Sequence, residues 1–526
     1  MVFKKALCIF LAVLSLATLC SCGENKKNEG TNTQKPSNST AKSEINLLYC
    51  KSDSFNPYTA VSEINRNLSK LLFEPLIKTD NEFEPVLRLA KTVELGDKTF
   101  TVELKAASFS DGSAVTANDV VYSYNIAKAS ATNYAHKLYE VTKIEAINDK
   151  TVVFHLTRND PYFLNLIDFP IIKADSDKVV DSDGVAAAPI GCGRYLLSEN
   201  NTILSFNKNF YGKKPNIEKI TLINAPDEAS VSHYVEVGAT DIYYTDLADG
   251  EIVRMSGKKA DVNLNNLVYI GINGSYPELA NKYIRYALSS AINRSEICSN
   301  AYYNNAVAAT GFYSPVFKDS NATQSLNSKP NLQITVENLD KIGYNKVAND
   351  GSRVNANGKR PKFTLLVNSE NASRVQAANL IKKQLEQAGI EITVISRSYE
   401  QYIEALTNRQ FQLYLGEINV LPNMDLSALV LEGGSAAFGV TPEAAPQNPD
   451  GTPGEIPKSN TQIAIDNFYN NSASLSDVAA TLLTEMPQIP ICYRKGLLFY
   501  DKSITDGVTV SQSDIYFGIE EYKVNN

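Results

Sequence analysis

The chain has 526 residues, of which 43% are hydrophobic and 21% are charged. A chain of this length is too long for one hydrophobic core, so we expect two or three domains. Acidic residues outnumber basic residues by 58 to 50, which gives a formal net charge of −8. This balance argues against nucleic acid or an anionic lipid surface as the binding partner.

The N-terminus has the three-part pattern of an export signal. Lys4 and Lys5 form a positive region, and an apolar stretch follows from residue 6 to residue 19. That stretch is shorter than the roughly 20 apolar residues that a transmembrane helix needs. The sequence LCSC at 19–22 then resembles a bacterial lipobox. We therefore predict a signal peptide at 1–21 and lipidation of Cys22, with an ordinary cleaved signal as the alternative.

The segment after the predicted cleavage site is expected to be a flexible tether. Residues 23–43 contain no aromatic and no branched aliphatic residue, so they cannot bury enough apolar surface to fold. A coil of this length spans roughly 25 Å, from about 5–6 Å times the square root of the residue number. We expect a soluble body on the extracytoplasmic face of the cell membrane, anchored through lipid and tether.

The soluble body alternates short strands with amphipathic helices, a pattern typical of an α/β fold. Alternating apolar and polar residues predict strands at 99–104 and 151–156. Between them, Asp111-Gly112 predicts a turn, and Thr116 with Asp119 predicts a capped helix start. Further along, the patterns predict helices at 282–301 and 372–388, strands at 390–395 and 412–417, and an exposed loop at 433–458.

The sequence lacks the spaced motifs of common catalytic sites. Its histidines, His136, His155 and His233, do not have zinc-site spacing, and no Walker A, GxGxxG or G-x-S-x-G sequence occurs. We therefore expect no enzymatic activity, no metal and no cofactor.

The cysteines beyond the predicted anchor are far apart in the sequence, and none has CxxC spacing. Buried free thiols are our expectation, and one disulfide is the alternative. These cysteines are Cys50, Cys192, Cys298 and Cys492.

Several separated segments together resemble the extracellular solute-binding proteins of family 5, which serve ABC importers of peptides and nickel. The most specific is FSDGSAVTANDVVYS at 109–123, which is similar to the family pattern WSDGTPVTAEDVVFS. Phe109 and Tyr211 stand where the family has tryptophan. The other segments, in family order, are FNPY at 55–58, LFEPL at 72–76, IGCGRY at 190–195, NKNFYG at 207–212, YIRYAL at 283–288 and INR at 292–294.

The resemblance implies a two-lobed α/β fold of the periplasmic-binding-protein type (class II), with an extra inserted domain and a ligand cleft between the lobes. Ligand contacts to both lobes exist only in the closed state, so a ligand shifts the population towards closure. The expected parts are lobe I at 44–64, 181–267 and 489–526, the inserted domain at 65–180, and the distal lobe at 268–488.

In peptide-binding members of the family, the ligand lies extended and is held through its backbone, as an added strand. The family's aspartate that pairs with a peptide amino group falls near Val420, so another acid has to supply the carboxylate. Asp425, Glu417 and Glu63 are the candidates. The residues expected at the cleft are Val61, Ser62, Glu63, Tyr134, Gly416, Glu417, Ile418, Asn419 and Asp425.

The function that the resemblance implies is that of a monomeric substrate-binding lipoprotein. It would capture an oligopeptide or dipeptide and deliver it to an ABC transporter permease. A non-peptide solute, such as a sugar or a nickel complex, becomes the alternative if no acid reaches the cleft. A surface sensor or adhesin without transport, and a secreted hydrolase, are the alternatives from other classes.

Overall fold

The structure is a computed structural model that describes residues 44–180, 186–248, 255–320, 325–349, 352–441, 445–447 and 454–525. The described residues belong to one compact unit. The predicted signal peptide, the lipidation site Cys22 and the tether lie outside the described residues.

Two large hydrophobic cores divide the described residues. The first core is built from buried side chains between residues 45 and 264 and between residues 498 and 524. The second core is built from buried side chains between residues 267 and 493, together with Phe83. The parts predicted as lobe I and as the inserted domain share the first core, so they form one body.

Two four-stranded sheets and several helices enclose the first core. The first sheet has the order β1-β12-β11-β10, with β1 parallel to β12, and the second has the antiparallel order β5-β6-β8-β7. Their strands are β1 (Glu44–Tyr49), β5 (Ala90–Leu95), β6 (Thr99–Leu104), β7 (Val141–Asn148), β8 (Thr151–Leu156), β10 (Tyr195–Leu197), β11 (Ile203–Phe206) and β12 (Lys219–Asn224). The helices are α1 (Glu63–Leu72), α2 (Ala117–Ala129), α3 (Asn133–Lys137) and α4 (Glu228–Glu236).

Short strand pairs and 3-10 turns complete this body. The pairs are β2 (Glu74–Pro75) with β9 (Pro170–Ile171), β3 (Ile77–Thr79) with β4 (Pro85–Leu87), and β22 (Ile504–Asp506) with β23 (Lys523–Val524). The 3-10 turns are Phe163–Leu166, Ser176–Lys178 and Ile519–Glu521.

A seven-stranded sheet forms the centre of the second body and extends into the first body through β13 and parts of β14 and β21. Its order is β13-β21-β14-β20-β18-β19, and β15 also pairs with β21. The strands are β13 (Ile242–Thr245), β14 (Lys258–Ile272), β15 (Ala306–Ala308), β18 (Lys362–Asn368), β19 (Glu391–Arg397), β20 (Leu413–Asn419) and β21 (Gln488–Tyr500). A small pair, β16 (Lys346–Val347) with β17 (Arg353–Val354), lies outside this sheet.

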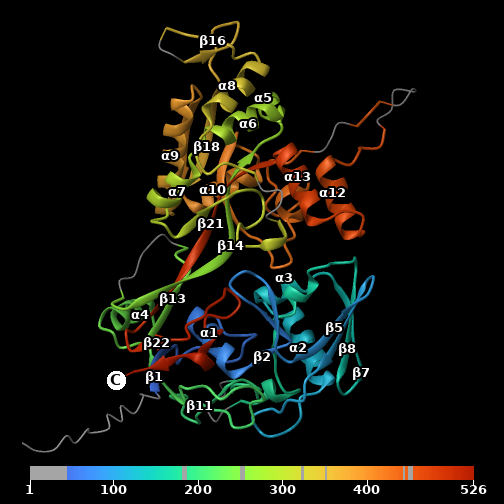
Figure 1. Ribbon diagram of the computed structural model, residues 1–526, viewed down its shortest axis with the longest axis vertical. Helices are drawn as coiled ribbons and strands as arrows, with labels where there is room; N and C mark the ends of the chain where they lie inside the picture. Colours follow the sequence, from blue (N-terminus) through green and yellow to red (C-terminus); the bar gives the residue numbers. More distant parts are fainter. Residues whose placement is uncertain are drawn as a thin grey trace, which may run out of the picture. The chain divides into compact units, whose positions relative to one another are not determined.

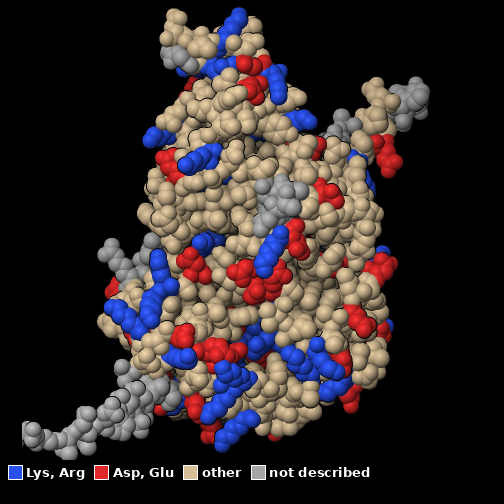
Figure 2. Space-filling view, in the orientation of Figure 1, with Lys and Arg blue, Asp and Glu red and all other residues tan. Residues whose placement is uncertain are grey.

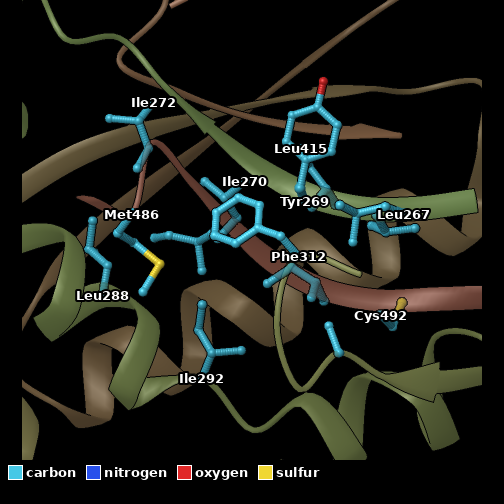
Figure 3. Close-up of a cluster of buried hydrophobic side chains, with 14 of the residues drawn as sticks. Leu267, Tyr269, Ile270, Ile272, Leu288, Ile292, Phe312, Leu415, Met486 and Cys492 are labelled. Atoms are coloured by element: carbon cyan, nitrogen blue, oxygen red, sulfur yellow. The ribbon is translucent and has the colours of Figure 1, made fainter. Parts of the chain in front are cut away.

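Nine helices among the described residues cover this sheet or follow it in the chain. They are α5 (Pro277–Ala280), α6 (Lys282–Ala291), α7 (Arg294–Asn300), α8 (Leu332–Lys341), α9 (Ala372–Gln387), α10 (Tyr399–Thr407), α11 (Ser427–Val430), α12 (Asn460–Tyr469) and α13 (Leu475–Glu485), with a 3-10 turn at Lys318–Ser320. Figure 3 shows part of the second core, where β14 side chains such as Ile270 meet Leu288, Ile292 and Met486.

The long antiparallel strands β14 and β21 connect the two bodies, and they run side by side in Figure 1. In β14 the side chains up to Leu264 belong to the first core, and those from Leu267 belong to the second. The register of the pair shifts between these same positions. In β21 the change falls between Tyr493 and Leu498. Two neighbouring strands that each cross from one core to the other are suited to act as a hinge.

Most local predictions agree with the structure. The strands at 99–104 and 151–156 are β6 and β8, and the Thr116 N–H donates to the Asp119 carboxylate (2.9 Å) where α2 begins. The helix predicted at 372–388 is α9, and the strands predicted at 390–395 and 412–417 are β19 and β20, each shifted by one or two residues. The described residues of 433–458 contain neither a helix nor a named strand, as expected for a loop.

The single helix predicted at 282–301 is wrong, because the structure has two helices, α6 and α7. Ile292 is extended between them (φ −84°, ψ 128°), and the Asn293 side chain accepts the Glu296 N–H (3.1 Å). Asparagine is a strong helix N-cap, so it starts a new helix here rather than continuing the old one.

Candidate functional site

A buried cluster of charged side chains lies where β21 passes from one core to the other. The Arg494 Nε lies 2.7 Å from Oε1 of Glu417 on β20, and the Arg374 side chain lies 2.8 Å from Oε2. Burial alone would raise the pKa of Glu417, but Arg494 and Arg374 hold it below its usual value. Because two guanidinium groups already neutralise this carboxylate, Glu417 is a poor partner for a ligand ammonium.

The loop after β13 brings the first body up to this cluster. Arg494 donates to the backbone carbonyl of Asp246, and the Asn371 side chain at the start of α9 donates to the carbonyl of Ala248 (2.6 Å). A small hollow lies at this meeting point. Its lining residues come from both bodies: Leu247, Tyr302, Tyr303, Asn305, Ser373, Arg494 and Lys495.

This hollow, at about 10 Å³, is far smaller than a typical ligand site. The Tyr302 hydroxyl is buried and has no hydrogen-bond partner among the described residues. Ligand pockets usually enclose roughly 300–1,000 Å³. An extended peptide therefore enters only if the two bodies move apart.

Glu63 is the predicted site acid that makes no ion pair with another described residue, unlike Glu417 and Asp425. It begins α1 and is exposed, yet desolvation and repulsion from Asp246 raise its pKa to about 6, against a smaller opposing effect of Arg66. The side-chain carboxylate of its neighbour Asp246 lies 4.0 Å from the Arg494 guanidinium.

The same face of α1 carries a half-buried cation at its other end. Lys70 is seven residues after Glu63, and this spacing places both on one face of the helix, about 10 Å apart along its axis. Lys70 donates to the hydroxyl of Tyr134 in α3 (2.7 Å) and lies 5.3 Å from the centre of its ring. Burial alone would lower the pKa of Lys70, but Tyr134 and Asp168 raise it to about 12. This face of α1 thus carries Glu63 at one end and Lys70 at the other. Lys70 is hydrogen-bonded to Tyr134, which is one of the residues expected at the cleft.

Strand β20 offers unpaired backbone along one edge. In an antiparallel pair, successive residues bond alternately to the partner strand and away from it. At the two ends of the pairing with β14, the Gln412 carbonyl accepts from the Asn273 N–H, and the Val420 N–H donates to the Asn265 carbonyl. The even-numbered residues of β20 therefore bond to β14. The peptide groups of Glu417 and Asn419 therefore point to the opposite edge, where the pairing with β18 ends at Tyr414. An extended ligand can add to this edge.

The other predicted cleft residues have different surroundings. The backbone N–H groups of Val61 and Ser62 donate to the Asp53 carboxylate at 2.8–3.1 Å, and the Val61 carbonyl accepts from Arg66 (2.7 Å). A ligand strand at Val61 would have to exchange these bonds. Gly416 is buried, and a side chain there would come within 3.0 Å of two tyrosine rings. Ile418 is half-buried and Asn419 is exposed.

Asp425 makes an ion pair across the two bodies. Its carboxylate lies 2.6 Å from Arg158, just after β8, and accepts from the Tyr139 hydroxyl (2.7 Å). The Arg158 guanidinium also pairs with Glu140 (2.8 Å) and stacks on the Tyr469 ring at 3.4 Å. Burial would raise the pKa of Asp425, but Arg158 holds it below its usual value.

Phe83 adds an apolar contact beside this ion pair. It lies in the turn between β3 and β4, has a left-handed backbone (φ 66°), and is buried in the second core. The Asn165 side chain donates to the carbonyls of Phe83 (3.1 Å) and Pro422 (3.0 Å). We call Phe83, Arg158 and Asp425 the closure contact, because these residues join the bodies away from the hinge strands.

The structure therefore brings Glu63 and Glu417 to the same region, near Arg494, and places Tyr134 further along α1 and Asp425 in the closure contact. Sequence reasoning missed Arg494, Arg374, Asp246 and Arg158. The one available signal was Arg494, a charged residue between apolar residues of what is now β21.

Comparison with known proteins decides the family. Residues 82–435 match the description "Bacterial extracellular solute-binding proteins, family 5 Middle". The chain belongs to this family. The match includes Tyr134, the segment 416–419 and Asp425, but not Glu63.

Curated relatives in the family share about a quarter of the sequence. The chain is 24% identical to the oligopeptide-binding protein AppA of Bacillus subtilis over 413 residues, which cover 73% of this chain and 72% of AppA. It is 21% identical to OppA of the same organism over 561 aligned positions, which cover 98% of each chain.

A solved family structure shares the fold. The ABC transporter substrate-binding protein CtaP from Listeria monocytogenes superposes with a TM-score of 0.67 at 19% identity, covering 93% of this chain and 100% of CtaP. The two-lobed fold expected from the sequence is therefore confirmed. Among the described residues, every helix is too short or too polar to cross a membrane.

The family segment at 109–123 is structural in this chain. Phe109 is buried where the family pattern has tryptophan, Gly112 has the positive φ of 85° that its turn requires, and the segment continues into α2. It positions α2 and α3, and through α3 it positions Tyr134.

Proposed function

We propose that this chain is the substrate-binding protein of an ABC importer, which captures an extended peptide by lobe closure and delivers it to a permease. The observation that carries the proposal is the arrangement of two cores joined by β14 and β21, with Glu63 of the first body and Glu417 on the β20 edge of the second body both near Arg494, where the bodies meet. The curated relatives AppA and OppA are named oligopeptide-binding proteins, which supports a peptide as the solute.

The ligand that fits this arrangement is a short zwitterionic peptide. Glu63 supplies the carboxylate for its amino group, because Glu417 and Asp425 are already paired with arginines. Lys70 lies about 10 Å away along α1, which corresponds to about three extended residues at roughly 3.3 Å each. The ligand carboxylate would reach Lys70 beside Tyr134.

The membrane arrangement is also part of this proposal. Cys22 carries the lipid, and residues 23–43 allow the body to reorient over the permease as a monomer. Mass measurement of the N-terminal peptide of exported protein checks for the lipid on Cys22.

The test of function is mass spectrometry of ligand released from denatured protein, together with calorimetric binding of the compounds identified. The expected result is unaltered peptides that rebind. Release of a sugar or a metal complex, or chemical change of the bound compound on incubation, would refute the proposal.

We predict that Glu63→Gln weakens binding of free tripeptides roughly tenfold, because a charge-assisted hydrogen bond to their amino group is lost. N-acetylated tripeptides should bind the variant and the wild type equally. For the same reason, wild-type affinity for free tripeptides should fall as the pH drops below about 6, where Glu63 becomes protonated. Calorimetric titration with paired libraries provides the measurement.

Glu94→Gln is the matched control, because Glu94 is exposed on β5 in the far sheet of the first body. It should leave both affinities unchanged. Equal losses for free and acetylated peptides in Glu63→Gln would mean that this acid does not pair with the amino group.

A further inference from the structure

Two buried cysteines from distant parts of the chain meet at the hinge strand. Cys298 in α7 is 7% exposed and Cys492 in β21 is fully buried, and both belong to the second core. Figure 3 shows Cys492 on its strand, as part of the second core. Both are free thiols in this structure.

Hydrogen bonds on either side hold the two thiols together. On the N-terminal side of both cysteines, the Arg294 Nε in α7 donates to the carbonyl of Pro490 (2.8 Å). On the C-terminal side of both cysteines, the Lys495 N–H donates to the carbonyl of Asn305 (2.9 Å). At the level of the thiols, β15 pairs with β21 through Ala308 and Cys492. The segment that carries Cys298 is thus fixed to β21 at both ends, which holds the two cysteines near each other.

The surroundings favour thiolate formation at Cys298. The hydrogen bond with Cys492 lowers the pKa of Cys298, against the effect of burial, and the charges of Arg294 and Lys495 lower it further. Arg294 precedes Cys298 by one helical turn, is buried, and donates to carbonyl and hydroxyl oxygens rather than to a carboxylate. Burial raises the pKa of Cys492, so Cys298 is the nucleophile of the pair.

We propose that Cys298 and Cys492 are a redox site, which is oxidised to a disulfide by an extracytoplasmic thiol–disulfide oxidoreductase while the chain folds. The Cys298 thiolate attacks the disulfide of the oxidoreductase and forms a mixed disulfide, releasing one of its sulfurs as a thiolate. The Cys492 thiolate then attacks Cys298 and displaces the second. Two S–H bonds are lost, one S–S bond forms, and the oxidoreductase takes up two electrons and two protons as a dithiol.

The disulfide would act on the strand that carries the site. Cys492 is two residues before Arg494, so the new bond ties α7 to the part of β21 that leads into the charged cluster. It closes a long loop, which removes much entropy from the unfolded chain. The proposal is independent of which solute the protein binds.

The test is alkylation of the denatured protein, purified without reductant from the extracytoplasmic fraction, followed by peptide mass spectrometry. Before reduction, only Cys50 and Cys192 should be labelled, and the peptides containing Cys298 and Cys492 should be found linked. After reduction, all of these cysteines should be labelled. Labelling of Cys298 and Cys492 without reduction would overturn the proposal.

A second measurement uses the melting temperature with and without dithiothreitol. We expect the reductant to lower it by about 5 °C in the wild type and in the control Cys192→Ala, because the long-loop crosslink is lost. Cys298→Ala should show no such difference. A difference of the same size in Cys298→Ala would assign the effect to other groups.

Discussion

Glu74→Gln is expected to lower the free energy of unfolding by about 3 kcal/mol, since it removes one member of a buried charge network. Glu74 is fully buried and lies 2.8 Å from Arg88, 3.6 Å from Lys78 and 3.8 Å from Arg194. Lys78 and Arg194 in turn contact Asp514, at 2.7 and 3.8 Å. With Glu520 beside Arg194, the network has equal numbers of acids and bases, so loss of one acid leaves a buried positive charge.

Urea unfolding of the variant and the wild type measures this effect. Glu218→Gln is the matched control, because its ion pair with Lys214 is exposed and should contribute less than about 1 kcal/mol. A loss in Glu74→Gln no larger than in the control would show that the network contributes little.

The network also fixes the direction of the pH dependence. Burial would raise the pKa of Glu74, but Lys78 and Arg88 lower it to about 2, below its usual value of 4.5. A carboxylate whose pKa is lower in the folded state stabilises that state above its unfolded pKa, and this contribution disappears as the pH falls. Wild-type stability should therefore drop between about pH 4.5 and 2, and Glu74→Gln should lose less over this range.

Asp425→Asn is expected to favour the open state of the empty protein by about 2 kcal/mol, which is roughly a thirtyfold change in the open-to-closed ratio. The reason is that Arg158 would lose its partner across the two bodies while Glu140 and Tyr469 still hold it in place. Small-angle X-ray scattering should show an increased radius of gyration. Peptide affinity should fall by one common factor for free and N-acetylated peptides.

Glu140→Gln provides a comparison, because Glu140 pairs with Arg158 from within the same body. It should alter the scattering much less than Asp425→Asn does. Selective loss of free-peptide binding in Asp425→Asn would instead restore Asp425 as the partner of the ligand amino group.

Figure 2 shows acidic and basic side chains interspersed over the visible face, as the modest net charge implies. No extended field of one sign covers this face, so recognition depends on particular residues. Single substitutions can therefore separate two roles. Glu63→Gln tests the pairing with the ligand amino group, and Asp425→Asn tests the contact between the two bodies.

The sequence was informative wherever the determining contacts are local. The alternation at 99–104 and the pairing of Thr116 with Asp119 involve neighbours in the chain, and the structure confirms both. The break before α7 is also local, but the sequence analysis missed it and predicted one continuous helix, although Asn293 is a strong N-cap residue. By contrast, Arg158 and Asp425 are 267 positions apart, and Arg494 and Asp246 are 248 apart. Such pairs follow from how the two bodies meet, which no pattern within a short window records.

The first core has a consequence for the order in which the chain can fold. Its sheet begins with β1 at Glu44, yet its buried residues include Ile504 and Val524, and Glu74 depends on Asp514. A chain that emerges N-terminus first therefore cannot complete this core until its last segment has also emerged. During translocation the early segments stay incompletely folded, with apolar surface available to chaperones or proteases, whereas residues 267–493 can assemble their own core sooner.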